Sequence, residues 1–285
     1  MMILPVSENT YSANRVSFFL EMALRKRQLE GLEVGKVRLE PEARRKVLGV
    51  SDLAKPPCSL WYSLNGQERD EYDPGTRFGF DTGHVIENYV LDLLETPMEN
   101  RQKTLGWHYA PAPGARIHGH PDGFLDGLIP GSRLVIECKA TGGYSFAKKL
   151  EEGPDSSHIE QAFCYASALR ADFFCIIYAN REAKKSTAFF KVFGYRVNSQ
   201  KMAKKAVRSL FHARFLPVLM AEKRPAPPLK PAYEFGPRGW RCRPDKTYFA
   251  RGKKQLQVGY CSYRRSCPEA IAYRKGLEAG KRASA

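Results

Sequence analysis

Residues 132–140, Ser-Arg-Leu-Val-Ile-Glu-Cys-Lys-Ala, constrain the fold of this chain more than any other segment. They are apolar and β-branched enough to form a buried strand, in which side chains alternate between two faces. Glu137 and Lys139 then share one face with Val135, whereas Cys138 lies on the other. Ionised side chains in a buried strand are costly unless they have partners. We therefore expect a polar site on this face, the alternative being a strand end that faces solvent.

The segment that precedes this strand also ends in polar residues. Residues 115–128 are expected to form a strand that a Pro-Gly-Ser turn at 130–132 joins to the next one. Asp122 lies between a proline and a glycine, where the backbone can bend. A short hairpin would therefore bring Asp122 close to Glu137.

Two carboxylates beside a lysine suit a hard divalent cation such as Mg²⁺ or Mn²⁺. Such an ion binds a scissile phosphate and lowers the pKa of a water molecule. Lys139 would orient that water or neutralise charge on the phosphate. Asp126 is a competing carboxylate, which we assign to the turn or to an outer position.

The remaining pattern predicts helices and strands in a mixed order. Helical periodicity covers residues 11–30, 78–95 and 199–220, and a further helix runs from a cap at Ser156 or Ser157 to about Leu169. Apolar, β-branched and aromatic runs predict strands at residues 173–180 and 187–197. We expect a mixed α/β (α+β) fold, with a central mixed sheet flanked by helices.

Prolines at positions 225, 227, 228 and 231 break the chain after the last expected helix. We place a domain boundary there. The expected organisation is an N-terminal helical segment (1–50), a core (51–222) and a basic, cysteine-containing C-terminal segment (223–285).

Charge is distributed unevenly along the chain. Residues 201–285 hold 21 basic and 5 acidic residues, while residues 1–200 are neutral, so the C-terminal part carries the whole net charge of +16. This asymmetry favours a polyanionic partner, of which nucleic acid is the usual one. A solubilising tail is the alternative. It does not explain the interleaved aromatic residues, which would stack on bases: Trp240, Tyr248, Tyr260 and Tyr263.

No stretch approaches the roughly 18 consecutive apolar residues of a membrane helix. The N-terminus has no apolar signal core, and the seven cysteines are odd in number. We therefore expect a protein of a reducing compartment, the cytoplasm or a host cytoplasm if phage-encoded, with no membrane partner and no disulfide framework.

Gly119-x-x-Asp122, followed after 14 residues by Glu137-Cys138-Lys139, resembles the G-x-x-D and E-x-K elements of the PD-(D/E)XK nucleases. Gln161 and Tyr165 lie four residues apart on one helix face. They look like the Q-x-x-x-Y motif of the RecB-like branch, which includes CRISPR-associated enzymes.

His84 matches the upstream helical histidine of the same branch, which serves there as an extra metal ligand. The resemblance implies a restriction-endonuclease-like core. It also implies an ion held by His84, Asp122 and Glu137, with the carbonyl of Cys138 as a further ligand, and a site that Gln161 and Tyr165 shape.

Some RecB-like enzymes hold a [4Fe–4S] cluster with one cysteine before the nuclease core and three after it. Cys58 is similar to the first of these, and Cys261 and Cys267 reproduce the C-x5-C spacing. Cys242 departs from the family, because 18 residues separate it from Cys261. Zinc accepts the same ligands, although its structural sites generally have closely spaced cysteine pairs. The other three cysteines are expected in the core: Cys138, Cys164 and Cys175.

The resemblance implies a Mg²⁺- or Mn²⁺-dependent deoxyribonuclease that acts on single-stranded DNA or DNA ends. A stand-alone exonuclease of recombination, repair or phage DNA processing is the first expectation, with a recombination or helicase protein as a potential partner. A CRISPR spacer-processing nuclease, a restriction endonuclease and a non-catalytic DNA-binding protein are the alternatives. The sequence leaves the oligomeric state open.

Overall fold

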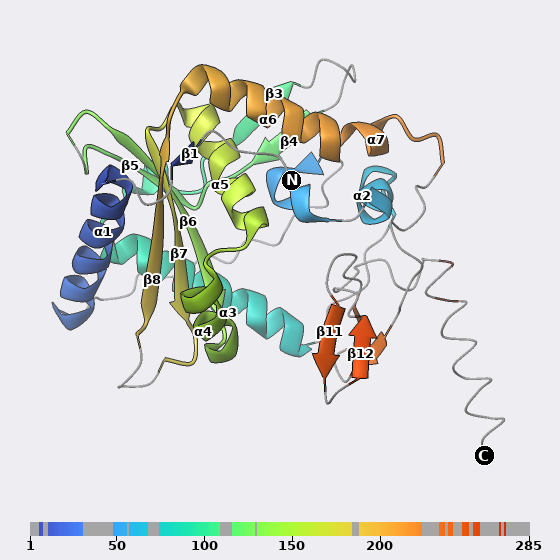
Figure 1. Cartoon of the computed structure of the whole chain (residues 1–285), viewed down its shortest axis with the longest axis horizontal. Helices are drawn as coiled ribbons and strands as arrows, with labels where there is room; N and C mark the ends of the chain where they lie inside the picture. Colours follow the sequence, from blue (N-terminus) through green and yellow to red (C-terminus); the bar gives the residue numbers. More distant parts are fainter. Residues whose placement is uncertain are drawn as a thin grey trace.

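The computed structural model describes most of the chain up to residue 223 and short stretches beyond it (Figure 1). The described residues are 6–7, 11–30, 48–55, 57–67, 74–108, 116–128, 130–183, 188–223, 234–236, 239–241, 247–250, 253–256, 268 and 271.

A five-stranded mixed sheet forms the centre of the fold, in the order β1-β8-β7-β6-β5. Its strands are β1 (Val6–Ser7), β5 (Gly123–Asp126), β6 (Arg133–Thr141), β7 (Phe173–Asn180) and β8 (Phe190–Val197). β6 and β7 run parallel, and the other neighbours are antiparallel. The predicted mixed α/β fold, with a central mixed sheet flanked by helices, is confirmed.

The prediction of a single strand over residues 115–128 is wrong, because this segment forms two strands that belong to two different sheets. β4 (Arg116–Gly119) pairs with β2 (Leu48–Gly49) and β3 (Leu105–His108), whereas β5 pairs with β6. Pro121 lies between β4 and β5, and a proline has no N–H to donate to a strand ladder. Asp122 therefore stands at the bend where one sheet gives way to the other.

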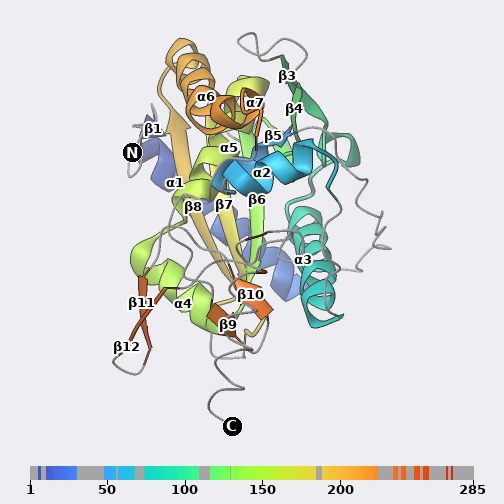
Figure 2. The same ribbon diagram turned by 90° about the vertical axis from the view of Figure 1, so that its right-hand side faces the viewer.

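Helices cover both faces of the central sheet (Figures 1 and 2). On one face α1 (Tyr11–Glu30) packs on β8, and α3 (Pro74–Leu93) packs on β6. On the other face α5 (Ser156–Leu169) packs on β6 and β7, and α6 (Gln200–Arg214) covers α5.

Two hydrophobic clusters correspond to these two faces. Leu134, Ile136 and Cys138 of β6 join the cluster with α1 and α3, whereas Val135 joins the cluster with α5 and α6. The alternation predicted for residues 132–140 is thus confirmed, and Glu137 belongs to the face that α5 covers.

The shorter helices connect these layers. They are η1 (Val50–Ala54), α2 (Pro57–Leu64), η2 (Met98–Asn100), α4 (Gly143–Glu152) and α7 (Leu216–Leu219). The helix expected over residues 199–220 is divided into α6 and α7 at Phe215. The N-cap residue of α5 is Asp155 and not Ser156 or Ser157 as expected, so the helix begins earlier, at Ser156, and ends at Leu169 as expected.

α4 was not expected from the sequence, because its Gly142-Gly143 start is typical of a loop. The Glu182 carboxylate accepts a hydrogen bond from the Gly143 N–H at 2.9 Å. This contact from 39 residues away satisfies one of the free N–H groups at the start of the helix.

Two antiparallel strand pairs lie in the C-terminal part: β9 (Glu234–Gly236) with β10 (Gly239–Arg241), and β11 (Thr247–Ala250) with β12 (Lys253–Leu256). Within the part of the chain that the structure describes, no helix is both long and apolar enough to cross a bilayer.

Candidate active site

The β5–β6 hairpin brings Asp122 beside the middle of β6. Gly123 pairs with Ile136, so Asp122 reaches the level of Glu137 and Cys138. The backbone N–H of Cys138 donates to Asp122 Oδ2 at 2.6 Å, which fixes the carboxylate in place. A Cβ on Gly123 would lie 2.9 Å from Leu91 of α3, so only glycine fits at this bend without a shift.

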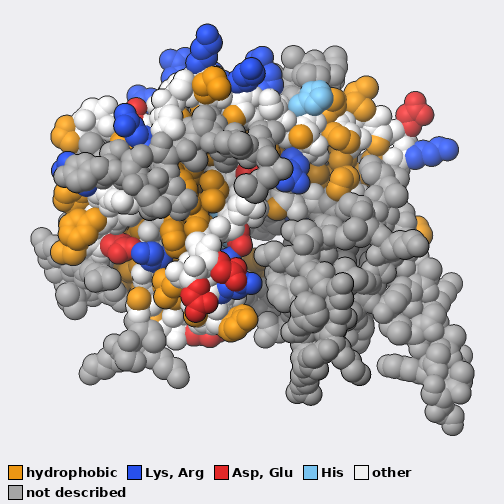
Figure 3. Space-filling view, viewed as in Figure 1, with side chains coloured by type: hydrophobic (Ala, Val, Ile, Leu, Met, Phe, Trp, Pro, Cys, Tyr) orange, Lys and Arg blue, Asp and Glu red, His pale blue; other side chains and the backbone are white. Residues whose placement is uncertain are grey.

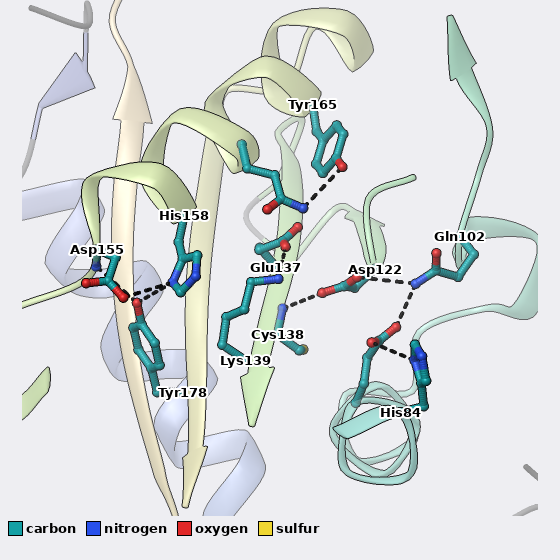
Figure 4. A network of polar contacts seen from close by, with 12 residues as sticks. His84, Gln102, Asp122, Glu137, Cys138, Lys139, Asp155, His158, Tyr165 and Tyr178 are labelled. Carbon is teal, nitrogen blue, oxygen red and sulfur yellow. Dashed lines mark hydrogen bonds and ion pairs between the residues drawn. The ribbon is translucent and has the colours of Figure 1, made fainter. Parts of the chain in front are cut away.

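Glu137, which is buried, and Lys139, which is half-buried, form an ion pair on the same strand. Asp122 is 7% exposed and Glu137 0%, so the fold takes both carboxylates out of water. Figure 4 shows the Lys139 amine beside the Glu137 side chain, and the Asp122 carboxylate pointing towards the backbone of Cys138. The three side chains predicted to converge do so.

Burial raises the pKa of Asp122 well above its usual range, and the Glu137 and Glu87 carboxylates raise it further. Burial likewise raises the pKa of Glu137, although Lys139 opposes this effect. Burial lowers the pKa of Lys139, but the Glu137 and Asp122 carboxylates outweigh it and leave the pKa above its usual value. The lysine therefore stays protonated. Its single positive charge does not balance the negative charges of the Asp122 and Glu137 carboxylates.

The donor groups at this place fit a hard divalent cation. Glu137 Oε2 is buried and has no hydrogen-bond partner, which is rare for a buried carboxylate oxygen. Among the residues that the structure describes, no three His, Cys, Asp or Glu side chains are grouped tightly enough to hold a metal by themselves. A pair of carboxylates supplemented by water and phosphate is nevertheless the usual way in which proteins hold Mg²⁺.

Glu87 of α3 is a site residue that the sequence reasoning missed. Gln102 Nε2 donates to Glu87 Oε1 at 2.6 Å and to Asp122 Oδ1 at 3.2 Å, so the amide joins the two carboxylates. The signal was present, because Glu87 lies one helical turn after His84 in the segment compared with the family.

His84 lies at the outer edge of this network. Its side chain is 62% exposed, and its Nδ1 lies 3.7 Å from Glu87 Oε2 (Figure 4). The role of His84 as a metal ligand stays a prediction.

Gln161 and Tyr165 of α5 face each other, with Gln161 Nε2 donating to the Tyr165 hydroxyl at 3.2 Å. Burial raises the pKa of Tyr165, and the charge of Glu137 raises it further, so the ring lies close to the carboxylate pair. A Cβ on Gly119 would lie 2.4 Å from the Tyr165 ring. The glycine of the G-x-x-D element therefore allows the tyrosine to approach.

Asp126 lies away from this group. It is exposed, ends β5 and forms an ion pair with Arg133 of β6 at 3.2 Å, so it belongs to the strand and not to the turn, at a position outside the site.

The cysteines divide into two groups. Cys138, Cys164 and Cys175 are buried in the core, as expected. Cys58 is buried on α2, while Cys242, Cys261 and Cys267 lie outside the described residues. Trp240 and Tyr248 fall on β10 and β11, whose side chains are not described, and Tyr260 and Tyr263 also lie outside the described residues.

No protein-family model matches this chain, and no curated protein matches its sequence. Several solved structures are distantly similar to its fold. The crystal structure of SSO0001 has a TM-score of 0.40 at 13% identity, over 70% of this chain and 87% of that chain.

The alkaline exonuclease LHK-Exo from Laribacter hongkongensis has a TM-score of 0.41 at 14% identity, over 62% of this chain and 91% of that chain. Its complex with dAMP has a TM-score of 0.42 at 14% identity, with the same coverage. Likeness at this level concerns the fold, and no activity follows from it.

Proposed function

We propose that this protein is a metal-dependent nuclease that hydrolyses phosphodiester bonds in DNA. The observation that carries the proposal is the convergence of Asp122, Glu137 and Lys139 in one buried cluster. Burying two carboxylates costs free energy, and a single lysine does not neutralise both. Such a cluster is better suited to binding a cation beside an anionic substrate than to stabilising the fold.

Asp122 and Glu137 would hold Mg²⁺ or Mn²⁺, with the carbonyl of Cys138 and His84 as further ligands. The bound ion would neutralise charge on the phosphate and lower the pKa of a nearby water molecule. Lys139 stays protonated beside Glu137, so it is suited to contact a phosphate oxygen or orient the water. Gln161 and Tyr165 would line the site on the side of α5.

The test is cleavage of labelled DNA with Mn²⁺ or Mg²⁺ by the wild type and by Glu137→Gln. We expect cleavage by the wild type, loss with chelator, and a fall of at least about a hundredfold in Glu137→Gln, as for removal of one electrostatic group of a site. Glu151→Gln, on the exposed face of α4, is the matched control and keeps wild-type activity. Equal cleavage by wild type and Glu137→Gln would disprove the assignment.

We propose further that cleavage proceeds from DNA ends. Linear end-labelled DNA would then be trimmed progressively, whereas closed circular DNA would remain intact. Discrete fragments would favour a restriction endonuclease. DNA binding without cleavage under any divalent metal would favour the non-catalytic DNA-binding protein.

The four-cysteine cluster stays a proposal that rests on sequence spacing. Cys58, buried on α2, would join Cys242, Cys261 and Cys267. We expect brown protein with visible iron–sulfur absorbance that Cys261→Ser abolishes. Colourless protein that contains zinc would contradict it.

A further inference from the structure

A second polar network lies next to the candidate active site. His158 of α5 places Nδ1 2.7 Å from the hydroxyl oxygen of Tyr178 on β7. The backbone N–H of Asp155 donates to the same hydroxyl oxygen at 3.1 Å. Lys149 of α4 in turn donates to Asp155 Oδ1 at 2.6 Å. The network thus ties α4, α5 and β7 together around one imidazole ring.

These contacts favour one tautomer of the His158 ring, the one that gives the Tyr178 hydroxyl hydrogen an acceptor. The Tyr178 oxygen already accepts from the Asp155 N–H, so its own hydrogen is available to donate to Nδ1. The Asp155 carboxylate lies 3.8 Å from Nδ1, too far for a hydrogen bond that would compete. Nδ1 is therefore the acceptor, and the neutral ring carries its hydrogen on Nε2.

Two neighbouring lysines keep this ring neutral. Burial lowers the pKa of His158 to about 4, and the charges of Lys139 and Lys149 add to the effect, while Asp155 opposes it. At neutral pH the ring is thus an uncharged donor between two cations. Within the described part of the chain, Nε2 has no hydrogen-bond partner, and the side chain is 24% exposed.

The ring lies on the side of Lys139 away from the carboxylates. Tyr178 is paired with Lys139 across β6 and β7, and His158 is three residues before Gln161 on α5. Figure 4 shows His158 on one side of Lys139 and Asp122 on the other. A DNA strand that crosses the site from Asp122 past Lys139 would bring its next phosphate towards His158.

We propose that His158 donates its Nε2–H to a non-bridging oxygen of the DNA phosphate adjacent to the one that is cleaved. This proposal rests on the proposed function, since it takes DNA as the substrate. Lys139 and Lys149 bring two positive charges near the ring, each beside a carboxylate partner, and a directed donor adds an orientation that a mobile lysine lacks. Tyr178, through Nδ1, is a positioning residue.

Two conservative variants separate substrate binding from a purely structural role. Glutamine carries an N–H near the position of Nε2, whereas asparagine reaches only the position of Nδ1. We expect His158→Asn to raise KM and the Kd for a short oligonucleotide in EDTA about tenfold, as for loss of a hydrogen bond to a charged group. His158→Gln stays within about threefold of the wild type, by the same reasoning, and kcat changes little in either.

A structural role predicts the reverse order, because asparagine preserves the contact to Tyr178. Equal affinity of the wild type and His158→Asn, or equal weakening in both variants, would overturn the proposal. Thermal melting of each variant checks that the fold is kept. Tyr178→Phe leaves the His158 ring in place but removes the hydroxyl group that selects its tautomer. We expect weaker DNA binding and an unchanged metal requirement for this variant.

Single methylphosphonate substitutions along the oligonucleotide locate the contact. In the wild type, neutralising the phosphate next to the cleaved one weakens binding, whereas in His158→Asn the same substitution adds no further loss. If the two proteins respond alike at every position, His158 does not contact a phosphate. The Glu137→Gln comparison tests the proposed function separately, so a failure of one proposal is distinguishable from a failure of the other.

Discussion

Glu137 and Lys139 lie two residues apart on β6, and the fold buries Glu137 together with Asp122. One lysine opposes two carboxylates, and Glu87 adds a third negative charge nearby. This excess of negative charge comes from individual side chains. Because of it, we expect the stability of the protein to depend on pH.

A carboxyl group whose pKa is raised in the folded protein binds its proton more tightly there than in the unfolded chain. Its contribution to stability is therefore lost as the pH rises from the usual aspartate range through the raised pKa. We expect Asp122→Asn to raise the melting temperature at pH 8 in EDTA, by roughly 2–4 °C per kcal/mol gained. The gain should shrink towards pH 4, as thermal melts across this range would show.

In the presence of Mn²⁺ we expect the wild type to melt at a higher temperature than Asp122→Asn, which is the opposite of the order in EDTA. Binding to the folded state stabilises the wild type, so its melting temperature should rise with Mn²⁺ concentration, while that of Asp122→Asn should not. Asp126→Asn, at an exposed position, is the control and should respond like the wild type. A melting temperature of Asp122→Asn below that of the wild type at every pH would show that the hydrogen bond to Cys138 matters more than the buried charge.

Contacts between elements explain why two distant sequence motifs belong to one site. Gly119 ends β4, and Tyr165 lies on α5, yet the ring packs where a Cβ on Gly119 would stand. The chain uses this glycine for close approach between a strand and a helix.

Gly119→Ala should destabilise the protein by about 1–3 kcal/mol, as overpacking does, and reduce cleavage by displacing Tyr165. Gly83→Ala is the control, since nothing lies within 4 Å of the added Cβ in the middle of α3. That variant should be stabilised by about 0.5–1 kcal/mol. Urea denaturation measures both, and a neutral Gly119→Ala would contradict the close contact.

α6 carries the basic character of the C-terminal part into the described region. It has no acidic residue, and its exposed positions include Lys201, Lys204, Lys205 and Arg208. In Figure 3 basic side chains gather along the edge where Figure 1 draws α6.

Replacing Lys204 and Arg208 by glutamine should weaken DNA binding about equally for all sequences. It should also reduce the slope of log affinity against log salt by roughly 1 for each phosphate contact that is lost. Arg170→Asn is the control, because asparagine tolerates the left-handed backbone at this exposed helix end. An unchanged salt dependence would exclude α6 from the DNA interface.

The whole molecule is held by two hydrophobic clusters on opposite faces of one sheet. α1 supplies Val16, Leu20 and Leu24 to the cluster that also contains Ile136 of β6. Residues from the expected N-terminal segment therefore belong to the same hydrophobic cluster as the strand that carries the candidate active site.

Leu20→Ala should lower the free energy of unfolding by about 2–5 kcal/mol, because a fully buried leucine is removed from this cluster. Met22→Ala, at a position that is 51% exposed, is the control and should change stability little. Denaturation followed by both fluorescence and circular dichroism should give one transition. Two separate transitions would show that α1 unfolds independently of the sheet.

The sequence by itself determined what is local or periodic. β7 spans the predicted residues 173–180, α1 the predicted 11–30, and the alternation in β6 places Glu137 and Val135 on one face. The motif spacing selected Asp122, Glu137 and Lys139, because strand alternation and a short hairpin suffice to bring them together. These are consequences of short-range geometry.

Only the tertiary structure decided the contacts between distant segments. The pairing of β4 and β5 in two different sheets, the Glu182 contact at the start of α4 and the Gln102 bridge to Glu87 each depend on partners far away in the chain. The fixed ring of His158 likewise depends on Tyr178 of a neighbouring strand. A hydrogen bond across such a separation is set by how sheets and helices pack, and no local pattern in the sequence encodes it.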